Sequence, residues 1–152
     1  MSEISNWKYE KWLKEMSGYN VVRDIRTYIN LEIYPEDLEI LITILMPKTF
    51  EIDELVFFDI NGDGEQIVRS AYEVPDPLGR LGFERQKDWN SISVSDIFFN
   101  NRDNSSDETM QNIAKLIKNN WEYHLIKLYP NKKFIVEVYG EYFDPYITFY
   151  QI

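Results

Sequence analysis

The sequence predicts an α+β fold in which helices pack on one face of an antiparallel sheet. Apolar residues recur at helical spacing near the N-terminus, one long amphipathic helix is expected in the last third, and strand-like alternation follows it. Strands that are close in sequence favour antiparallel pairing, so the last two should form a β-hairpin. The 152 residues have the size of one domain and contain no linker or repeat, so we expect a single domain over residues 1–152.

Three helices are predicted in the N-terminal third. Apolar spacing indicates a helix over 9–16 and a second over 21–29, although the β-branched residues of the second also suit a strand. The third is expected over 35–45, with a proline in its first turn. Glu36 and Asp37 complement the positive end of its dipole, which supports the prediction of a helix start there.

The middle of the chain is predicted to consist mainly of strands. Residues 50–60 should form a tight hairpin that turns at 53–54. Residues 67–74 and 91–99 are rich in β-branched or aromatic side chains and are expected to be strands. The segment 75–87 contains two prolines and two glycines, so we expect a long loop there.

A long helix and a terminal hairpin are predicted for the last third. Ser105, followed three residues later by Glu108, is typical of a capping box, and an apolar stripe then occupies 110–128. Strands over 134–139 and 146–152 are expected around a turn that contains glycine, aspartate and proline. The long helix therefore comes just before the C-terminal hairpin.

Composition excludes several classes of function. Lys and Arg number 16 against 26 Asp and Glu, which gives a formal charge of −10 and a pI near 4.6. This charge repels nucleic-acid backbones and anionic membranes, so neither is expected as a partner. The absence of Cys excludes disulfides, thiolate nucleophiles and cysteine metal sites. No acid, base and nucleophile can be recognised around the single histidine, His124, so we expect no enzyme activity and no cofactor.

Two segments bear on location. Residues 1–16 carry six charged side chains and therefore lack the apolar core of a secretory signal. The longest nearly apolar run, 40–46, is much shorter than the roughly 20 residues that span a bilayer. We therefore expect a cytoplasmic protein without a membrane-spanning segment.

The negative charge is concentrated in one stretch. Residues 32–76 hold twelve acidic side chains against two basic ones, whereas the rest of the chain balances fourteen against fourteen. Such asymmetry speeds encounter with a basic protein, so we expect a docking face for one. The residues assigned to this face are Glu36, Asp37, Glu39, Asp53 and Glu54. The alternative is a solvated acidic face that only aids solubility.

Aromatic residues are the second unusual feature, with 4 Trp, 11 Tyr and 9 Phe. Most should lie in the core or in cross-strand pairs. Tyr142, Phe143 and Tyr146 fall in the predicted C-terminal turn, where all three are difficult to bury, so we assign them as interface anchors. A platform that stacks on sugars or bases is the alternative use.

One acidic turn resembles the first half of a calcium-binding loop. Asp59, Asn61 and Asp63 supply oxygens at positions one, three and five, and a glycine stands at position six. The second half does not fit, because position twelve is Ser70 where a bidentate glutamate completes such loops. A plain turn is the alternative, since Asn-Gly and Asp-Gly are strong turn signals. Because the first half of the loop fits, binding of calcium or a small ligand through it is the second function that we expect.

Short motifs spread over residues 34–150 carry a family resemblance. They are Tyr34-Pro35-Glu36-Asp37-Leu38, Phe50-Glu51-Ile52-Asp53, Asp96-Ile97-Phe98, Trp121, Tyr129-Pro130-Asn131-Lys132-Lys133-Phe134 and Thr148-Phe149-Tyr150. In these motifs the chain resembles a family of small acidic bacterial proteins without an assigned activity, which implies a shared fold. In size, acidity and lack of a catalytic signature it is also similar to immunity proteins that neutralise bacterial toxins. This second likeness implies a basic partner, such as the nuclease domain of a toxin.

Overall fold

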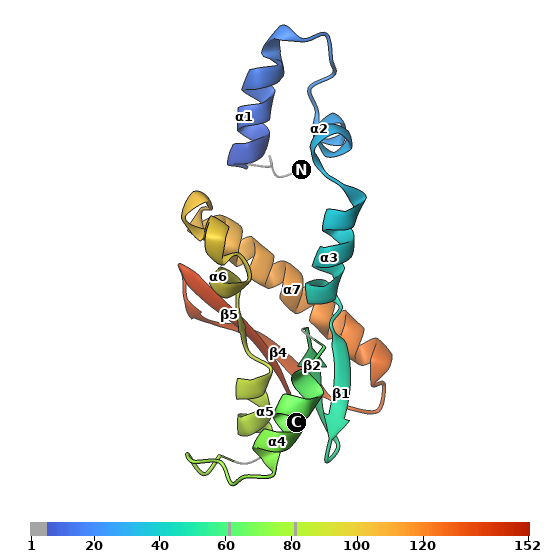
Figure 1. Cartoon of the computed structure of the whole chain (residues 1–152), viewed down its shortest axis with the longest axis vertical. Helices are drawn as coiled ribbons and strands as arrows, with labels where there is room; N and C mark the ends of the chain where they lie inside the picture. The colour runs from blue at the N-terminus through green and yellow to red at the C-terminus, as the bar shows by residue number, and fades with distance from the viewer. Residues whose placement is uncertain (1–5, 61, 81) are drawn as a thin grey trace. The chain divides into compact units, whose positions relative to one another are not determined.

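The computed structural model describes residues 6–60, 62–80 and 82–152 (Figure 1). The helices, with η for short 3₁₀ segments, are α1 (Trp7–Glu15), η1 (Met16–Gly18), α2 (Ile25–Glu32), α3 (Pro35–Leu45), α4 (Gly64–Tyr72), α5 (Gly82–Trp89), α6 (Val94–Ile97), η2 (Phe99–Asn104) and α7 (Asp107–Leu128). The strands are β1 (Lys48–Ile52), β2 (Leu55–Asp59), β3 (Ile92–Ser93), β4 (Phe134–Glu141) and β5 (Asp144–Gln151).

The α+β prediction is confirmed. β1 and β2 form one antiparallel sheet, and β3, β5 and β4 form a second in that order. The long helix α7 precedes the β4–β5 hairpin, as the sequence predicts. The chain divides into two compact units, Met1–Leu41 and Ile42–Ile152, which are described separately below, and the single-domain organisation stays a prediction.

In the first unit, side-chain caps and a small aromatic cluster define the helices. Asn6 caps α1 by accepting hydrogen bonds from two backbone N–H groups. Asp24 caps α2 by accepting the Thr27 N–H, which lowers the pKa of the Asp24 carboxyl below its usual value and starts the helix later than predicted. Trp12 is buried, and its ring lies 5.5 Å from that of Tyr28.

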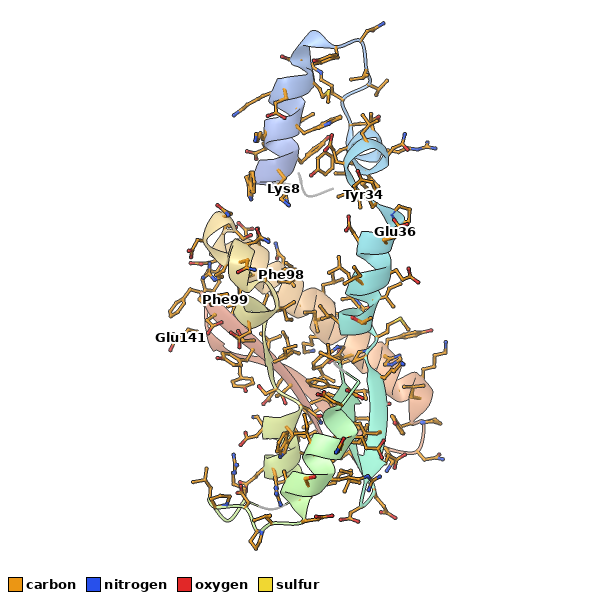
Figure 2. The ribbon with its side chains drawn as sticks, viewed as in Figure 1. Lys8, Tyr34, Glu36, Phe98, Phe99 and Glu141 are labelled. Carbon is orange, nitrogen blue, oxygen red and sulfur yellow. The ribbon has the colours of Figure 1, made fainter. Side chains whose placement is uncertain are left out.

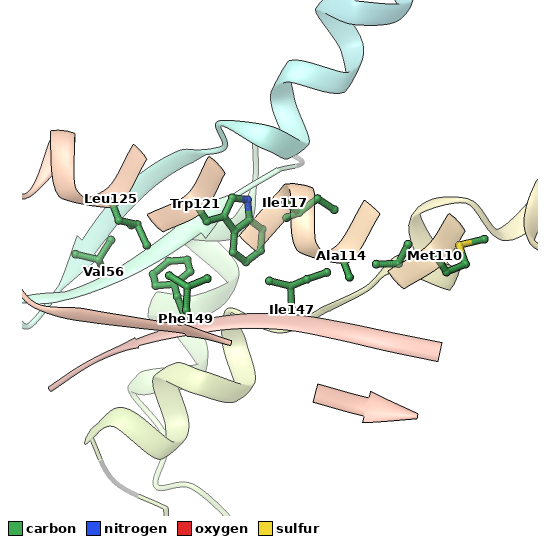
Figure 3. Packing of buried hydrophobic residues seen from close by; sticks show 10 residues of the cluster. Val56, Met110, Ala114, Ile117, Trp121, Leu125, Ile147 and Phe149 are labelled. Atoms are coloured by element: carbon green, nitrogen blue, oxygen red, sulfur yellow. The ribbon is translucent and has the colours of Figure 1, made fainter. Parts of the chain in front are cut away.

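In the second unit, the apolar stripe of α7 packs on one face of β4 and β5 (Figure 3). The stripe consists of Met110, Ala114, Ile117, Trp121 and Leu125. It meets Ile147 and Phe149, alternate residues of β5 that point to the same side of the sheet. The indole Nε1 of Trp121 donates to the carbonyl of Ile44 at 2.8 Å, so the last turn of α3 also belongs to this core.

Side-chain amides join the two sheets where no strand pairing does. Val56 donates its N–H to Gln151 Oε1 at 2.7 Å, and its carbonyl accepts from both Gln86 Nε2 and Asn90 Nδ2. Asn90 Oδ1 accepts from the Phe58 N–H, and its Nδ2 also donates to the carbonyl of Phe149. Gln86 and Asn90 are completely buried. These bonds satisfy outward-facing backbone groups of β2 and β5, which would be costly to bury unpaired.

The strand prediction for 67–74 is wrong, because Gly64–Tyr72 is helix α4. Val68 and Tyr72, four residues apart, share one helical face and pack with Phe57, and the ring centroids of Phe57 and Tyr72 lie 5.4 Å apart. The i,i+4 ion pair of Arg69 and Glu65 supports the same helix at 2.8 Å. Tertiary packing thus outweighs the strand preference of β-branched residues at this place.

The predicted loop over 75–87 and strand over 91–99 are also partly wrong. Gly82–Trp89 forms α5, whose buried contacts are made by an amide and not by an apolar stripe. The strand is short because the Ser93 side chain accepts the Asp96 N–H and starts α6. The 50–60 hairpin and the long helix are confirmed, although Ser106, one residue after the predicted Ser105, caps α7.

Candidate protein-binding surfaces

The predicted acidic residues of α3 are exposed, and two of them, Glu36 (labelled in Figure 2) and Asp37, lie in its first turn. Asp37 Oδ2 accepts the Tyr34 N–H at 3.2 Å, while the Asp37 N–H donates to the Tyr34 carbonyl. Asp37 therefore caps the start of α3, so its carboxylate is partly used within the chain. Glu36 and Glu39 have no ion pair among the described residues, so their carboxylates are available to a partner.

The predicted acidic residues of the second unit form the turn between β1 and β2. Asp53 has φ 48° and Glu54 has φ 68°, the left-handed conformation that both central residues of a type I′ hairpin turn adopt. Lys132 Nζ and Gln151 Nε2 both donate to the Glu54 carbonyl, at 2.5 Å and 3.1 Å. The backbone of the turn is therefore fixed, and both carboxylates are exposed.

The two acidic groups belong to different units, Met1–Leu41 and Ile42–Ile152, so each group is described by itself. A single face that contains all five carboxylates stays a prediction. Glu51, a neighbour of the turn, pairs instead with Lys132 at 2.9 Å. Charge counted along the chain therefore overstates the free negative charge near this turn.

The predicted aromatic anchors fall in two different environments. Tyr142 and Phe143 form the β4–β5 turn and are exposed, whereas Tyr146 lies within β5 and is half-buried. The Tyr146 ring lies 5.6 Å from that of Tyr139, and it occupies the space that a Cβ at Gly140 (φ +88°) would need. Tyr146 therefore packs within the sheet, and the two turn residues are the exposed part of the predicted set.

The sheet face opposite α7 carries an aromatic cluster around a lysine that the sequence did not single out. Lys87 Nζ lies 5.4 Å and 5.3 Å from the ring centroids of Tyr139 and Tyr150, and it pairs with Glu137. The hydrogen bond to Glu137 raises the pKa of the Lys87 ammonium. Phe83 adds a further ring against Tyr150. Only the fold of α5 onto β5 brings these residues together, so no local signal could have revealed them.

The calcium-like turn is held by the side-chain carboxylate of Asp59. Asn61 lies outside the described residues, and Asp59 Oδ1 accepts the N–H groups of Gly62 and Gly64 at 2.7 Å and 3.1 Å. Asp59 and Asp63 line an open hollow of about 280 Å³ together with Trp89. Within the described ranges, no three acidic or histidine side chains are grouped as a metal site would require.

His124 has a packing role in the second unit. Its Nε2 lies 3.1 Å from the Pro47 carbonyl and donates to it, which ties α7 to the residue before β1. Its Nδ1 is buried without a hydrogen-bond partner among the described residues. In the described part of the chain, no group therefore holds Nδ1 in the way that the orienting residue of a general base does.

Comparison of the chain with protein-family models, with curated proteins and with solved structures finds no match. Among the described residues, no helix combines the length and the apolar character needed to cross a membrane. The surfaces described above are therefore the basis for assigning a function.

Proposed function

We propose that the protein is a cytoplasmic protein-binding module, an immunity-type inhibitor that covers the basic site of a toxin domain such as a nuclease. The main support for the proposal is that a helix and a hairpin turn each present two exposed carboxylates on a defined backbone. Glu36 and Glu39 project from α3, and Asp53 and Glu54 project from the β1–β2 turn. The net charge of −10 gives the same preference for a basic partner.

Inhibition would work by occlusion. Carboxylates at the rim of an interface raise the association rate with a basic protein, and the rate falls as salt screens them. Exposed aromatic side chains, here Tyr142 and Phe143, lower the dissociation rate when a partner buries them. No acid–base chemistry by this chain is required for such a role.

The test uses the product of a neighbouring gene that encodes a basic toxin-like domain, mixed with the purified protein. Association rates are measured by stopped flow over a salt series for Glu36→Gln and for the double variant Asp53→Asn/Glu54→Gly. We expect each to slow association several-fold at low salt and little at high salt. The double variant removes two charges while it installs Asn-Gly, the sequence that the turn conformation favours, so loss of folding cannot explain a loss of binding.

Glu84→Gln is the matched control, because Glu84 is also an exposed glutamate in the first turn of a helix but lies outside the acidic stretch. It should leave the association rate nearly unchanged. If Glu36→Gln and the turn variant behave like Glu84→Gln, the proposed acidic face is wrong.

A further inference from the structure

One end of the second unit exposes three large aromatic side chains from two segments that are far apart in sequence. Phe99 in η2 is 77% exposed, and Tyr142 and Phe143 in the β4–β5 turn are 63% and 55% exposed. We call these three residues the aromatic tip. Phe98, next to Phe99, packs against the core, so the chain turns one ring inward and leaves the other in solvent (Figure 2). Exposed aromatic groups of this kind mark interaction sites.

The aromatic tip rests on a fixed backbone. Arg102 of η2 donates to the carbonyl of Phe143 at 2.5 Å, and Gln111 of α7 donates to the carbonyl of Tyr142 at 2.8 Å. Arg102 is itself held by Asp107 at 3.0 Å. Neither turn residue has a positive φ, so this is not one of the turns that hairpin twist favours, and these side chains hold it in place. A surface ordered before binding loses less entropy when a partner docks.

The same end is acidic. Residues 99–108 and 141–144 together contain five acidic side chains and one basic side chain, Arg102, whose charge Asp107 offsets. Glu141 stands directly opposite Asp144 across the strands, an arrangement of like charges that costs stability. Asp103 and Glu141 are exposed and have no ion pair among the described residues. The carboxylates and the three rings therefore come from the same two segments, which the hydrogen bond from Arg102 to the Phe143 carbonyl joins.

We infer that the aromatic tip docks an arginine-bearing segment of a protein partner. A guanidinium group stacks on aromatic faces and pairs with carboxylates, and it is more weakly hydrated than an ammonium, so this surface selects Arg over Lys. A partner that is apolar only would leave Asp103 and Glu141 desolvated without a counter-charge, at a cost. The inference deepens the proposed function, on which it rests, by naming a second docking surface and the side chain that the surface recognises.

The experiment titrates the full chain with a peptide of nine arginines and, separately, with a peptide of nine lysines, followed by backbone amide NMR shifts. We expect the arginine peptide to shift the signals of 99–103 and 141–144, with an apparent affinity several-fold above that of the lysine peptide. Tyr142→Ala/Phe143→Ala should remove this preference while weaker, charge-only binding persists. Phe99→Ala, on the other segment, should reduce the preference without altering the turn.

The matched control is Glu84→Gln, which removes one exposed carboxylate outside both proposed surfaces and should leave the preference for arginine intact. Equal affinity of the two peptides for the wild-type chain, or an unchanged preference in Phe99→Ala and in the double alanine variant, overturns the inference. The outcome separates the two proposals. If the tip selects arginine but Glu36→Gln leaves toxin association unchanged, only the acidic face is contradicted. If Glu36→Gln slows toxin association but the tip shows no preference for arginine, only the inference about the tip is contradicted.

Discussion

Gln86 and Gln151 exchange two hydrogen bonds: Gln86 Oε1 accepts the backbone N–H of Gln151 at 2.8 Å, and Gln86 Nε2 donates to Gln151 Oε1 at 2.9 Å. The same two side chains also reach Val56 of β2. Together with Asn90 they connect the β1–β2 hairpin to β5. Because side chains and not strand pairs make this connection, single substitutions can test it.

Asn90→Ala should destabilise the second unit by about 2–4 kcal/mol, because it leaves the Phe58 N–H without its acceptor and takes a donor from the Phe149 carbonyl. Urea unfolding followed by tryptophan fluorescence measures the change. Asn120→Ala is the matched control, since the bond that Asn120 donates to the Leu116 carbonyl is exposed and lies within its own helix. Similar losses for the two variants would show that the buried amides have no special role.

Glu54→Gly should stabilise the protein by about 1 kcal/mol. Glu54 adopts φ 68°, a conformation that costs a residue with a Cβ about 1–2 kcal/mol and a glycine little. Differential scanning calorimetry measures the rise in Tm. Glu54→Ala is the comparison, because it removes the same carboxylate but keeps the strained conformation. An equal effect of both substitutions would assign the change to charge.

Gly140→Ala should destabilise the β4–β5 hairpin by at least about 1 kcal/mol, the lower cost of a left-handed φ. A Cβ at this position would also lie 2.9 Å from the Asp144 carbonyl oxygen and 3.0 Å from the Tyr146 ring. Chemical denaturation measures the loss. Gly18→Ala, where a Cβ meets nothing within 4 Å and φ is not positive, should not destabilise the chain comparably.

Acid should remove a defined part of the stability through Asp76 and Arg80. Arg80 donates to both carboxylate oxygens of Asp76, at 2.8 Å and 2.9 Å, and these bonds hold the pKa of Asp76 well below its usual value. A lowered folded-state pKa stabilises the fold above the unfolded pKa of about 3.9, and this contribution is lost as the pH falls further towards the folded value.

The measurement for this pair is the free energy of unfolding in urea from about pH 6 to about pH 2.5, a window that covers the ordinary carboxyl pKa. The deficit of Asp76→Asn relative to the wild-type chain should shrink as the pH falls. Arg80→Met removes both side-chain hydrogen bonds to Asp76, together with the ion pair of Arg80 with Asp88, and should show the same trend. A deficit that stays constant over this range for both variants would contradict the assignment.

Elements with local signals were predictable from sequence. The apolar stripe of α7, the proline at the start of α3 and the acidic turn at Asp53 and Glu54 each express their structure within a few residues. The helix α5 was missed because the polar Gln86 provides its buried contact. The capping bond of Asp37 was predictable from sequence, because an acidic residue stands three positions after Tyr34 at the start of a helix. Counting charges alone includes this carboxylate among those available to a partner.

The candidate site was predictable only in part, for the same physical reason. Counting along the chain finds charges that are close in sequence, such as Glu36 and Glu39. It cannot find the charges around the aromatic tip, since Asp103 and Glu141 come from segments far apart in sequence that tertiary contacts such as the bond from Arg102 to the Phe143 carbonyl bring together. Charged residues that come from distant segments can be recognised as neighbours only once the fold is known.

The amide connection between the sheets also has a kinetic consequence. The Val56 N–H donates to Gln151 Oε1, and the Phe58 N–H donates to Asn90 Oδ1. The protection of these two amides from solvent exchange therefore depends on side chains and not on a strand ladder. The hairpin ladder of β1 and β2 and the ladder of β4 and β5 can both stay intact while these bonds open. Hydrogen exchange at these two amides should therefore report how often the two sheets part, as a motion distinct from global unfolding.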